Sequence, residues 1–278
     1  MELKILEDIP PWEWPEGTDR VLLGILRDNQ KDKSERLLAA ELAGDYTVVN
    51  DELAEALLSI VRNGEESEDL RAKAVISLGP VLETAYIDEF EEPEAVPISE
   101  ETFHEIQASL RELYMDMDVP MEVRRRTLEA SVRAPQEWHQ QAIRDAYSSG
   151  DDLWRLTAVF CMRYVRGFDT QILEALEDEN QDIHYEAVCA ARTWEVDAAW
   201  SHIANLATSE LTDKSLRLAA IEAVASIRPQ EAPDILSEVS QSDDEDILDA
   251  VYEAMAMCGM FPDEDYDDDD DWDERTLH

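Results

Sequence analysis

An arginine followed three residues later by a small residue returns along the chain at a nearly constant interval, and this spacing constrains the fold more than any other feature. The interval is 29 to 35 residues, apart from one step of 53 between Arg71 and Arg124. About thirty residues is the length of a repeat made of two short helices. The clear copies are Arg36…Ala39, Arg71…Ala74, Arg124…Thr127, Arg155…Ala158 and Arg217…Ala220, and the degenerate ones are His184…Ala187 and Leu248…Val251. Such repeats stack and bury a continuous core, so we predict an all-α, right-handed solenoid of about seven antiparallel helix pairs.

The helices follow from apolar residues at three- and four-residue spacing, with acidic or hydroxyl residues placed to cap their first turns. One run, 86–98, contains two prolines and five carboxylates and is predicted to be an acidic loop inserted into the array. The predicted helix pairs are 18–27 with 33–44, 53–61 with 70–82, 99–113 with 119–132, 136–147 with 151–165, 170–176 with 182–194, 198–207 with 213–227, and 232–239 with 243–257.

Three regions are predicted along the chain. Residues 1–17 contain three prolines, together with Trp12 and Trp14, which we expect to fold over the first helix pair as a cap. Residues 18–258 form the solenoid. Residues 259–278 form an acidic tail that self-repulsion keeps disordered.

The second helices of several repeats carry a specific resemblance. The segments 152–158 (DLWRLTA), 69–74 (DLRAKA) and 213–220 (DKSLRLAA) resemble the second helix of HEAT repeats, in particular the short bacterial HEAT-like class, over roughly residues 30–258. The resemblance implies that Arg36, Arg71, Arg124, Arg155 and Arg217 form a ladder that pairs with carboxylates of the adjoining repeat. His184 and Leu248 depart from the pattern, so the ladder is expected to weaken toward the C-terminus.

Charge restricts the class of partner. The chain has 67 acidic and 23 basic residues, a formal net charge of −44. A field of this sign repels phosphate backbones and anionic lipid, so neither direct nucleic-acid binding nor membrane binding is expected. Scarce lysine and abundant carboxylate also suit a salt-rich cytoplasm. Cys161, Cys189 and Cys258 lie in helical apolar stretches and fit a reducing compartment, so we expect a cytoplasmic protein.

The acidic C-terminal run, residues 263–274, has two interpretations. It either keeps the protein solvated or binds a basic surface, with Tyr266 and Trp272 as apolar anchors. Alternating Asp265, Asp267 and Asp269 imitate the start of a calcium loop, but the glycine at position six and the glutamate at position twelve are absent.

No catalytic, metal-binding or cofactor-binding residue is predicted. Glu101 and His104 have the spacing of a di-iron ligand pair, yet the second such pair that the site requires does not occur. The sequence also lacks HExxH, CxxC and GxxxxGK motifs.

Arginines and aromatic residues supply the candidate partner-binding residues. The arginines of the middle region either form a positive strip or pair internally with carboxylates; Arg124 and Arg155 belong to the ladder, whereas Arg125 and Arg126 are freer to reach outward. Trp154, Tyr185 and Trp194 either fill gaps between repeats or form a binding groove.

We therefore predict a non-catalytic scaffold or adaptor that binds a protein partner, one with a basic surface, on its concave helical face. One alternative is an enzyme resembling the HEAT-like chromophore lyases. The other is an acidic nucleic-acid mimic that occupies a DNA-binding protein.

Overall fold

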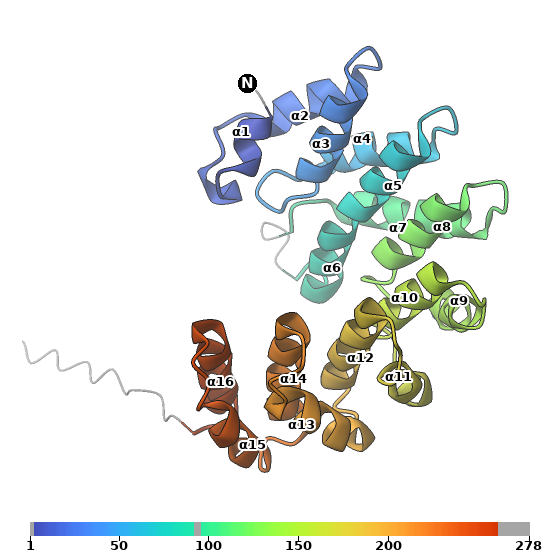
Figure 1. Ribbon diagram of the computed structural model, residues 1–278. Coiled ribbons are helices and arrows are strands. Elements are labelled where there is room, and N and C mark those ends of the chain that lie inside the picture. The colour runs from blue at the N-terminus through green and yellow to red at the C-terminus, as the bar shows by residue number, and fades with distance from the viewer. Residues whose placement is uncertain (1–2, 92–95, 261–278) are drawn as a thin grey trace, which may run out of the picture. The chain divides into compact units, whose positions relative to one another are not determined.

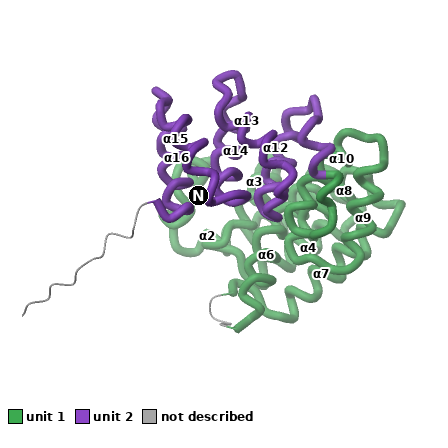
Figure 2. Tube along the Cα trace, turned by 90° about the horizontal axis from the view of Figure 1, so that it is seen from below, with its two compact units in different colours: residues 1–171 green, residues 172–278 purple. Residues whose placement is uncertain are grey.

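The structure is a computed structural model, and it describes residues 3–91 and 96–260. Over these residues the secondary structure is entirely helical, as Figure 1 shows, which confirms the predicted all-α class. The chain divides into two compact units, Met1–Gln171 and Ile172–His278 (Figure 2). The division falls within α11 (Asp169–Ala175). The domain boundaries expected from sequence stay a prediction.

Unit 1 consists of helix pairs that pack in two layers. The first helices α2, α4 and α7 lie side by side in one layer, and the second helices α3, α5, α8 and α10 lie side by side in the other. A short helix α1 (Lys4–Glu7) and a 3-10 turn (Pro11–Glu13) precede them. The pairs are α2 (Thr18–Arg27) with α3 (Lys33–Leu42), α4 (Asp51–Arg62) with α5 (Glu68–Ser77), α7 (Glu100–Met115) with α8 (Met121–Ser131), and α9 (Glu137–Tyr147) with α10 (Asp152–Cys161).

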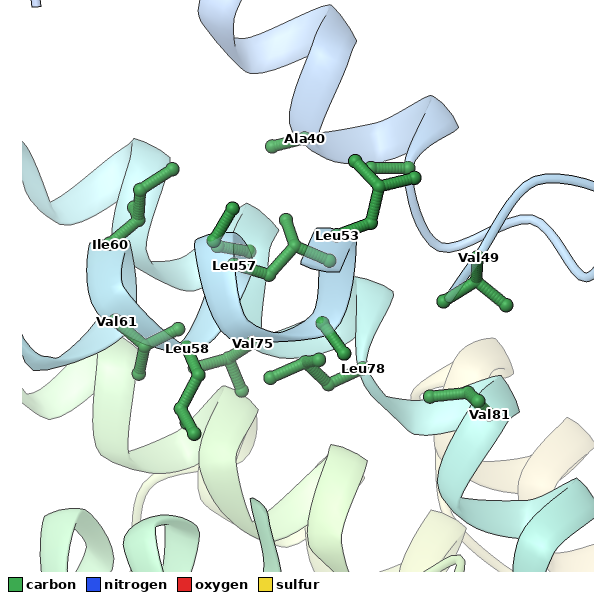
Figure 3. Packing of buried hydrophobic residues seen from close by; sticks show 14 of the residues in the cluster. Ala40, Val49, Leu53, Leu57, Leu58, Ile60, Val61, Val75, Leu78 and Val81 are labelled. Atoms are coloured by element: carbon green, nitrogen blue, oxygen red, sulfur yellow. The ribbon is translucent and has the colours of Figure 1, made fainter. Parts of the chain in front are cut away.

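The second pair shows how the sequence builds one repeat. The Asn50 side chain accepts a hydrogen bond from the Leu53 amide and caps α4, which begins two residues before the predicted start at 53. Figure 3 shows α4 buried between its neighbours, with Leu53 and Leu57 on the side of Ala40 and Leu58 on the opposite side. A helix that is apolar on two sides must be covered on both, which the layers of this unit do.

The second helix of this pair ends earlier than predicted. The expected helix 70–82 is two helices, α5 and α6 (Gly79–Asp88), because Pro80 lacks an amide donor and starts a new helix in its first turn. Residues 86–88 therefore belong to a helix and not to the predicted acidic loop. Gly44 allows the close packing there, because a Cβ on it would clash with the Ser77 carbonyl oxygen.

The two N-terminal tryptophans behave differently. The Trp14 indole Nε1 donates a hydrogen bond to the Leu6 carbonyl at 3.0 Å, and its ring packs against the core of the unit. Trp12 is 78% exposed, so the expectation that both rings fold over the first helix pair is wrong for Trp12. Trp12 lies in the 3-10 turn, none of whose residues is buried.

Unit 2 repeats the same plan. The second helices α12 (Gln181–Thr193), α14 (Lys214–Ile227) and α16 (Glu245–Met257) pack on one another, as do the first helices α13 (Trp200–Thr208) and α15 (Ala232–Val239). Carboxylate or amide side chains cap the second helices: Asn180, Asp213 and Asp244 accept hydrogen bonds from the amides of their first turns. The chain thus has a HEAT-like helical repeat fold.

Candidate functional site

Most of the ladder arginines bind the C-terminal end of the first helix in their own helix pair. The Nε atoms of Arg71, Arg124 and Arg217 each lie 2.9 Å from a carbonyl oxygen ten residues earlier, on Val61, Tyr114 and Ala207 respectively. In each case that carbonyl belongs to the second-last residue of the preceding helix, where backbone acceptors have no partner within the helix. A guanidinium there also favours the negative end of the helix dipole.

Arg36 adds a buried ion pair to the same contact. It donates to the Leu26 carbonyl at 3.1 Å, and its two terminal nitrogens bind the Glu66 carboxylate at 2.8 and 2.9 Å. Both side chains of the ion pair are nearly buried. The expected pairing with a carboxylate of the adjoining repeat is therefore found at Arg36. At Arg71, Arg124 and Arg217 the hydrogen bond goes to the backbone of the same helix pair instead.

The remaining ladder positions differ. The Arg155 guanidinium lies over the Tyr147 ring, 5.2 Å from its centroid. Leu248 is partly exposed on α16. His184 occupies the ladder position of α12, and its side chain points to the next repeat.

The His184 site joins two repeats of unit 2. His184 Nε2 lies 3.0 Å from His202 Nε2 on α13, and His202 Nδ1 lies 3.1 Å from a carboxylate oxygen of Glu177. A carboxylate can only accept, so His202 carries its proton on Nδ1 and its Nε2 accepts from His184. Burial, followed by the His202 ring, lowers the pKa of His184. The three side chains form a polarised chain from carboxylate to imidazole to imidazole.

A cavity of about 500 Å³ lies next to His184. His184 and Tyr185 line it from α12, and Leu206 and Leu216 line it from α13 and α14. The turn between α13 and α14 contributes Leu211, which is 97% exposed. The lining also contains two carboxylates and several neutral polar groups: Asp182, Asp213, Gln181, Ser209, Thr212 and Ser215. Apolar side chains surrounded by acidic and hydroxyl groups form a site for an apolar residue next to a cation.

A second cavity, of about 380 Å³, lies in unit 1 at the corresponding edge of the first repeats. Arg36 and Glu66 line it together with Glu55 and Asn63. Arg36 and Glu66 already bind one another, so they offer less to a ligand than the groups of the cavity beside His184.

Arg125 does not reach outward, and the expectation that it does is wrong. The residue is 4% exposed, it holds both oxygens of Glu122, and it donates to Thr157 Oγ1 at 2.8 Å. Arg126 is half-buried and binds Glu122 and Glu129 at 2.9 and 2.8 Å. The two arginines thus pair internally, which is the alternative the sequence left open.

The candidate aromatic residues are divided between packing and surface. Trp154 is half-buried, with its ring centroid 6.3 Å from that of Tyr114 in the preceding repeat. Trp194 is half-buried at the end of α12, whereas Tyr185 is 37% exposed and lines the cavity of unit 2. Tyr266 and Trp272 lie outside the described residues.

A buried serine–histidine contact, which the sequence did not predict, is structural. His139 Nδ1 accepts the Gln136 amide proton at 2.8 Å, so Nε2 carries the hydrogen and faces Ser131 Oγ at 3.0 Å. A general base would need its lone pair at the serine, and this imidazole presents its proton instead. Burial lowers the pKa of His139 to about 4. The signal in the sequence was the capping position of His139, three residues after Gln136.

In the part of the chain that the structure describes, no three or more histidine, cysteine or acidic side chains form a group that could hold a metal ion. Nor does any described helix have the length and apolar character to cross a membrane.

No protein-family model matches the chain, and no curated protein matches it. Among solved structures, YibA of Escherichia coli matches with 16% identity and a TM-score of 0.47, covering 90% of this chain and 84% of YibA. Human deoxyhypusine hydroxylase matches with 15% identity and a TM-score of 0.38, covering 88% and 98%. The CpcE–CpcF phycocyanin lyase of Nostoc matches with 16% identity and a TM-score of 0.45, covering 91% and 98%.

These comparisons correct one expectation. The sequence predicted that the protein is not an enzyme, but the matching structures include a hydroxylase and a lyase. The general exclusion of catalysis is therefore wrong, because chains with matching folds include enzymes.

Proposed function

We propose that this protein binds a segment of a partner protein, and that the segment inserts an apolar side chain flanked by basic residues into the cavity beside His184. The observation that carries the proposal is the lining of that cavity, in which Leu211 and Tyr185 are exposed beside Asp182 and Asp213. The proposal concerns binding and leaves catalysis open.

Exposed leucine is costly unless something covers it. Full burial of the Leu211 side chain by a partner would contribute about 1.5–3 kcal/mol to the free energy of binding. The Asp213 carboxylate beside it accepts hydrogen bonds from Ser215, which lower the pKa of Asp213 and keep it charged. A cation on the partner would therefore meet a fixed negative charge next to the apolar contact.

The charge of the whole chain supports the same partner. A net charge of −44 attracts a basic segment over a distance and repels an acidic one. Tyr266 and Trp272 in the acidic C-terminal run stay proposed as a second contact with a basic surface. Buried free cysteines fit a reducing compartment, and the proposal places the protein in the cytoplasm.

Fluorescence anisotropy with three labelled peptides tests the proposal. The first peptide has one leucine flanked by arginines, the second has glutamates in place of the arginines, and the third has alanine in place of the leucine. We expect the first to bind most tightly, and we expect Leu211→Ser to weaken its binding about tenfold. Asp182→Asn should weaken it less and reduce its dependence on salt.

Met117→Ser is the matched control, because Met117 is also an exposed apolar side chain but lies in unit 1. Two results would contradict the proposal: equal loss of binding in Met117→Ser and Leu211→Ser, or equal binding of the leucine and alanine peptides. Either would show that the cavity beside His184 does not specifically hold the leucine side chain of the peptide.

A further inference from the structure

His184 and His202 face one another through the ring nitrogens that histidine uses to bind metals. The two Nε2 atoms are 3.0 Å apart, on different helices of unit 2. We propose that this pair binds a divalent transition metal ion of the zinc type between the two Nε2 atoms. The proposal departs from the sequence, which predicted no metal ligand, and it does not depend on the proposed partner binding.

The separation of the two nitrogens is close to that required. Two imidazole nitrogens that each lie about 2.0–2.1 Å from a tetrahedral zinc ion are roughly 3.3 Å apart. The observed 3.0 Å needs an increase of a few tenths of an ångström, which small rotations of the two side chains supply. In the absence of metal one proton lies between the two nitrogens, on Nε2 of His184. Metal binding moves that proton to Nδ1 of His184, so that both rings bind the ion as neutral imidazoles.

Glu177 fixes the tautomer of His202 that can bind a metal ion through Nε2. Its carboxylate accepts the Nδ1 proton of His202 at 3.1 Å, which leaves the Nε2 lone pair directed at His184. Carboxylate–histidine–metal chains use the same arrangement to orient the ring and to raise its basicity. Burial favours the neutral form of His184, which is the form that binds metal.

Access and selectivity also fit an ion of this class. The His202 side chain is 28% exposed, and His184 lines the cavity of unit 2, so water or a ligand can complete the coordination. Two imidazoles favour zinc, nickel or copper over magnesium or calcium, which prefer oxygen ligands. Excess magnesium therefore separates this site from the many carboxylates of the chain.

Isothermal titration calorimetry with Zn²⁺, in buffer containing excess Mg²⁺, tests the proposal on the full chain. We expect one saturable site in the wild type and at least a tenfold weaker affinity in His202→Ala. Glu177→Gln should weaken binding about tenfold, since carboxylates that orient a ligating histidine contribute 10–100-fold.

His104→Ala is the control, because His104 is an exposed histidine beside Glu100 in unit 1. Glu177 is also exposed, so its variant changes the site without disturbing the core. If His202→Ala and Glu177→Gln both bind Zn²⁺ as the wild type does, or if the wild type shows no saturable binding above the magnesium background, the proposal is wrong. Loss of binding in His104→Ala alone would overturn it equally.

Discussion

The ladder position of the first repeat in unit 1 and that of α12 in unit 2 hold different residues with different consequences. In unit 1, Arg36 binds the Leu26 carbonyl of its own helix pair and the Glu66 carboxylate, and it is always charged. In unit 2, His184 contacts His202 of the next pair through a ring nitrogen that can donate or accept, depending on the tautomer. The same register position is therefore a fixed support in one unit and an adaptable contact in the other.

The difference shows where a repeat protein can acquire function. A guanidinium has five donors and no acceptor, so it satisfies the exposed carbonyls at a helix end and cannot bind a metal ion or hold a proton in relay. An imidazole in place of the guanidinium does not bind those carbonyls, but it places a nitrogen lone pair beside a cavity. Positions at which a repeat departs from its own pattern are the first places to look for binding.

The largest expected effect is at Arg36. Arg36→Leu leaves the Glu66 carboxylate nearly buried without its partner, so the opening free energy of the first repeats should fall by about 3–5 kcal/mol. Hydrogen exchange resolved by segment measures this for α3 and α4 separately from unit 2. The matched change, His184→Leu, removes one hydrogen bond between two rings and should cost only about 1 kcal/mol in α12 and α13.

The double variant Arg36→Leu with Glu66→Leu distinguishes a lost pair from a lost side chain. Because it leaves no uncompensated buried charge, it should recover most of the stability lost in the single variant. If the double variant is no more stable than Arg36→Leu, the ion pair does not account for the difference between the two ladder positions.

The second effect depends on pH and concerns His139 in unit 1. Burial lowers the pKa of His139 to about 4 in the folded protein, whereas the pKa of a histidine in the unfolded chain is about 6.5. The unfolded state therefore binds the proton first as pH falls, and stability is lost between about pH 6.5 and 4, by about 2 kcal/mol at about pH 5. Urea unfolding of wild type and His139→Gln, compared at neutral pH and at about pH 5, isolates this contribution from that of the carboxylates.

The expected sign is specific. His139→Gln should be the less stable protein at neutral pH, and the difference between the two should shrink as pH falls. His104→Gln, on the exposed face of α7, should run parallel to the wild type. A wild type whose stability relative to His139→Gln does not change with pH would show that His139 takes up its proton in the folded state as readily as in the unfolded one.

The sequence predicted the helix pairs well and the contacts of the site poorly, for physical reasons. Apolar spacing and the Asn50 cap are local signals, so α4 begins within two residues of its predicted start. The break at Pro80 was missed because the apolar spacing continues through it. The contact of His184 with His202 joins helices that only the stacking of repeats brings together, and neither residue carries a local motif for it.

Restoring an arginine at the ladder position of α12 should give this repeat the support that the arginines provide elsewhere. His184→Arg places a guanidinium within reach of the Glu174 carbonyl, which is ten residues earlier and second-last in α11, as at the other ladder sites. We expect α12 to gain about 1 kcal/mol of stability, measured by hydrogen exchange, and Zn²⁺ binding to be lost. A variant that is destabilised and still binds Zn²⁺ would show that the ladder register does not extend to this repeat.

The smallest effect is expected at Lys33, and it sharpens the comparison because this ion pair is a single exposed contact, whereas that of Arg36 is bidentate and nearly buried. The Lys33–Asp69 pair has an N–O distance of 2.9 Å, almost that of Arg36–Glu66 at 2.8 Å, but both of its side chains are exposed. Lys33→Ala should therefore lower the free energy of unfolding by no more than about 0.5 kcal/mol, and by less at high salt. A loss as large as that of Arg36→Leu would mean that the net charge of −44, and not the exclusion of water from the pair, sets the energy of each cation in this chain.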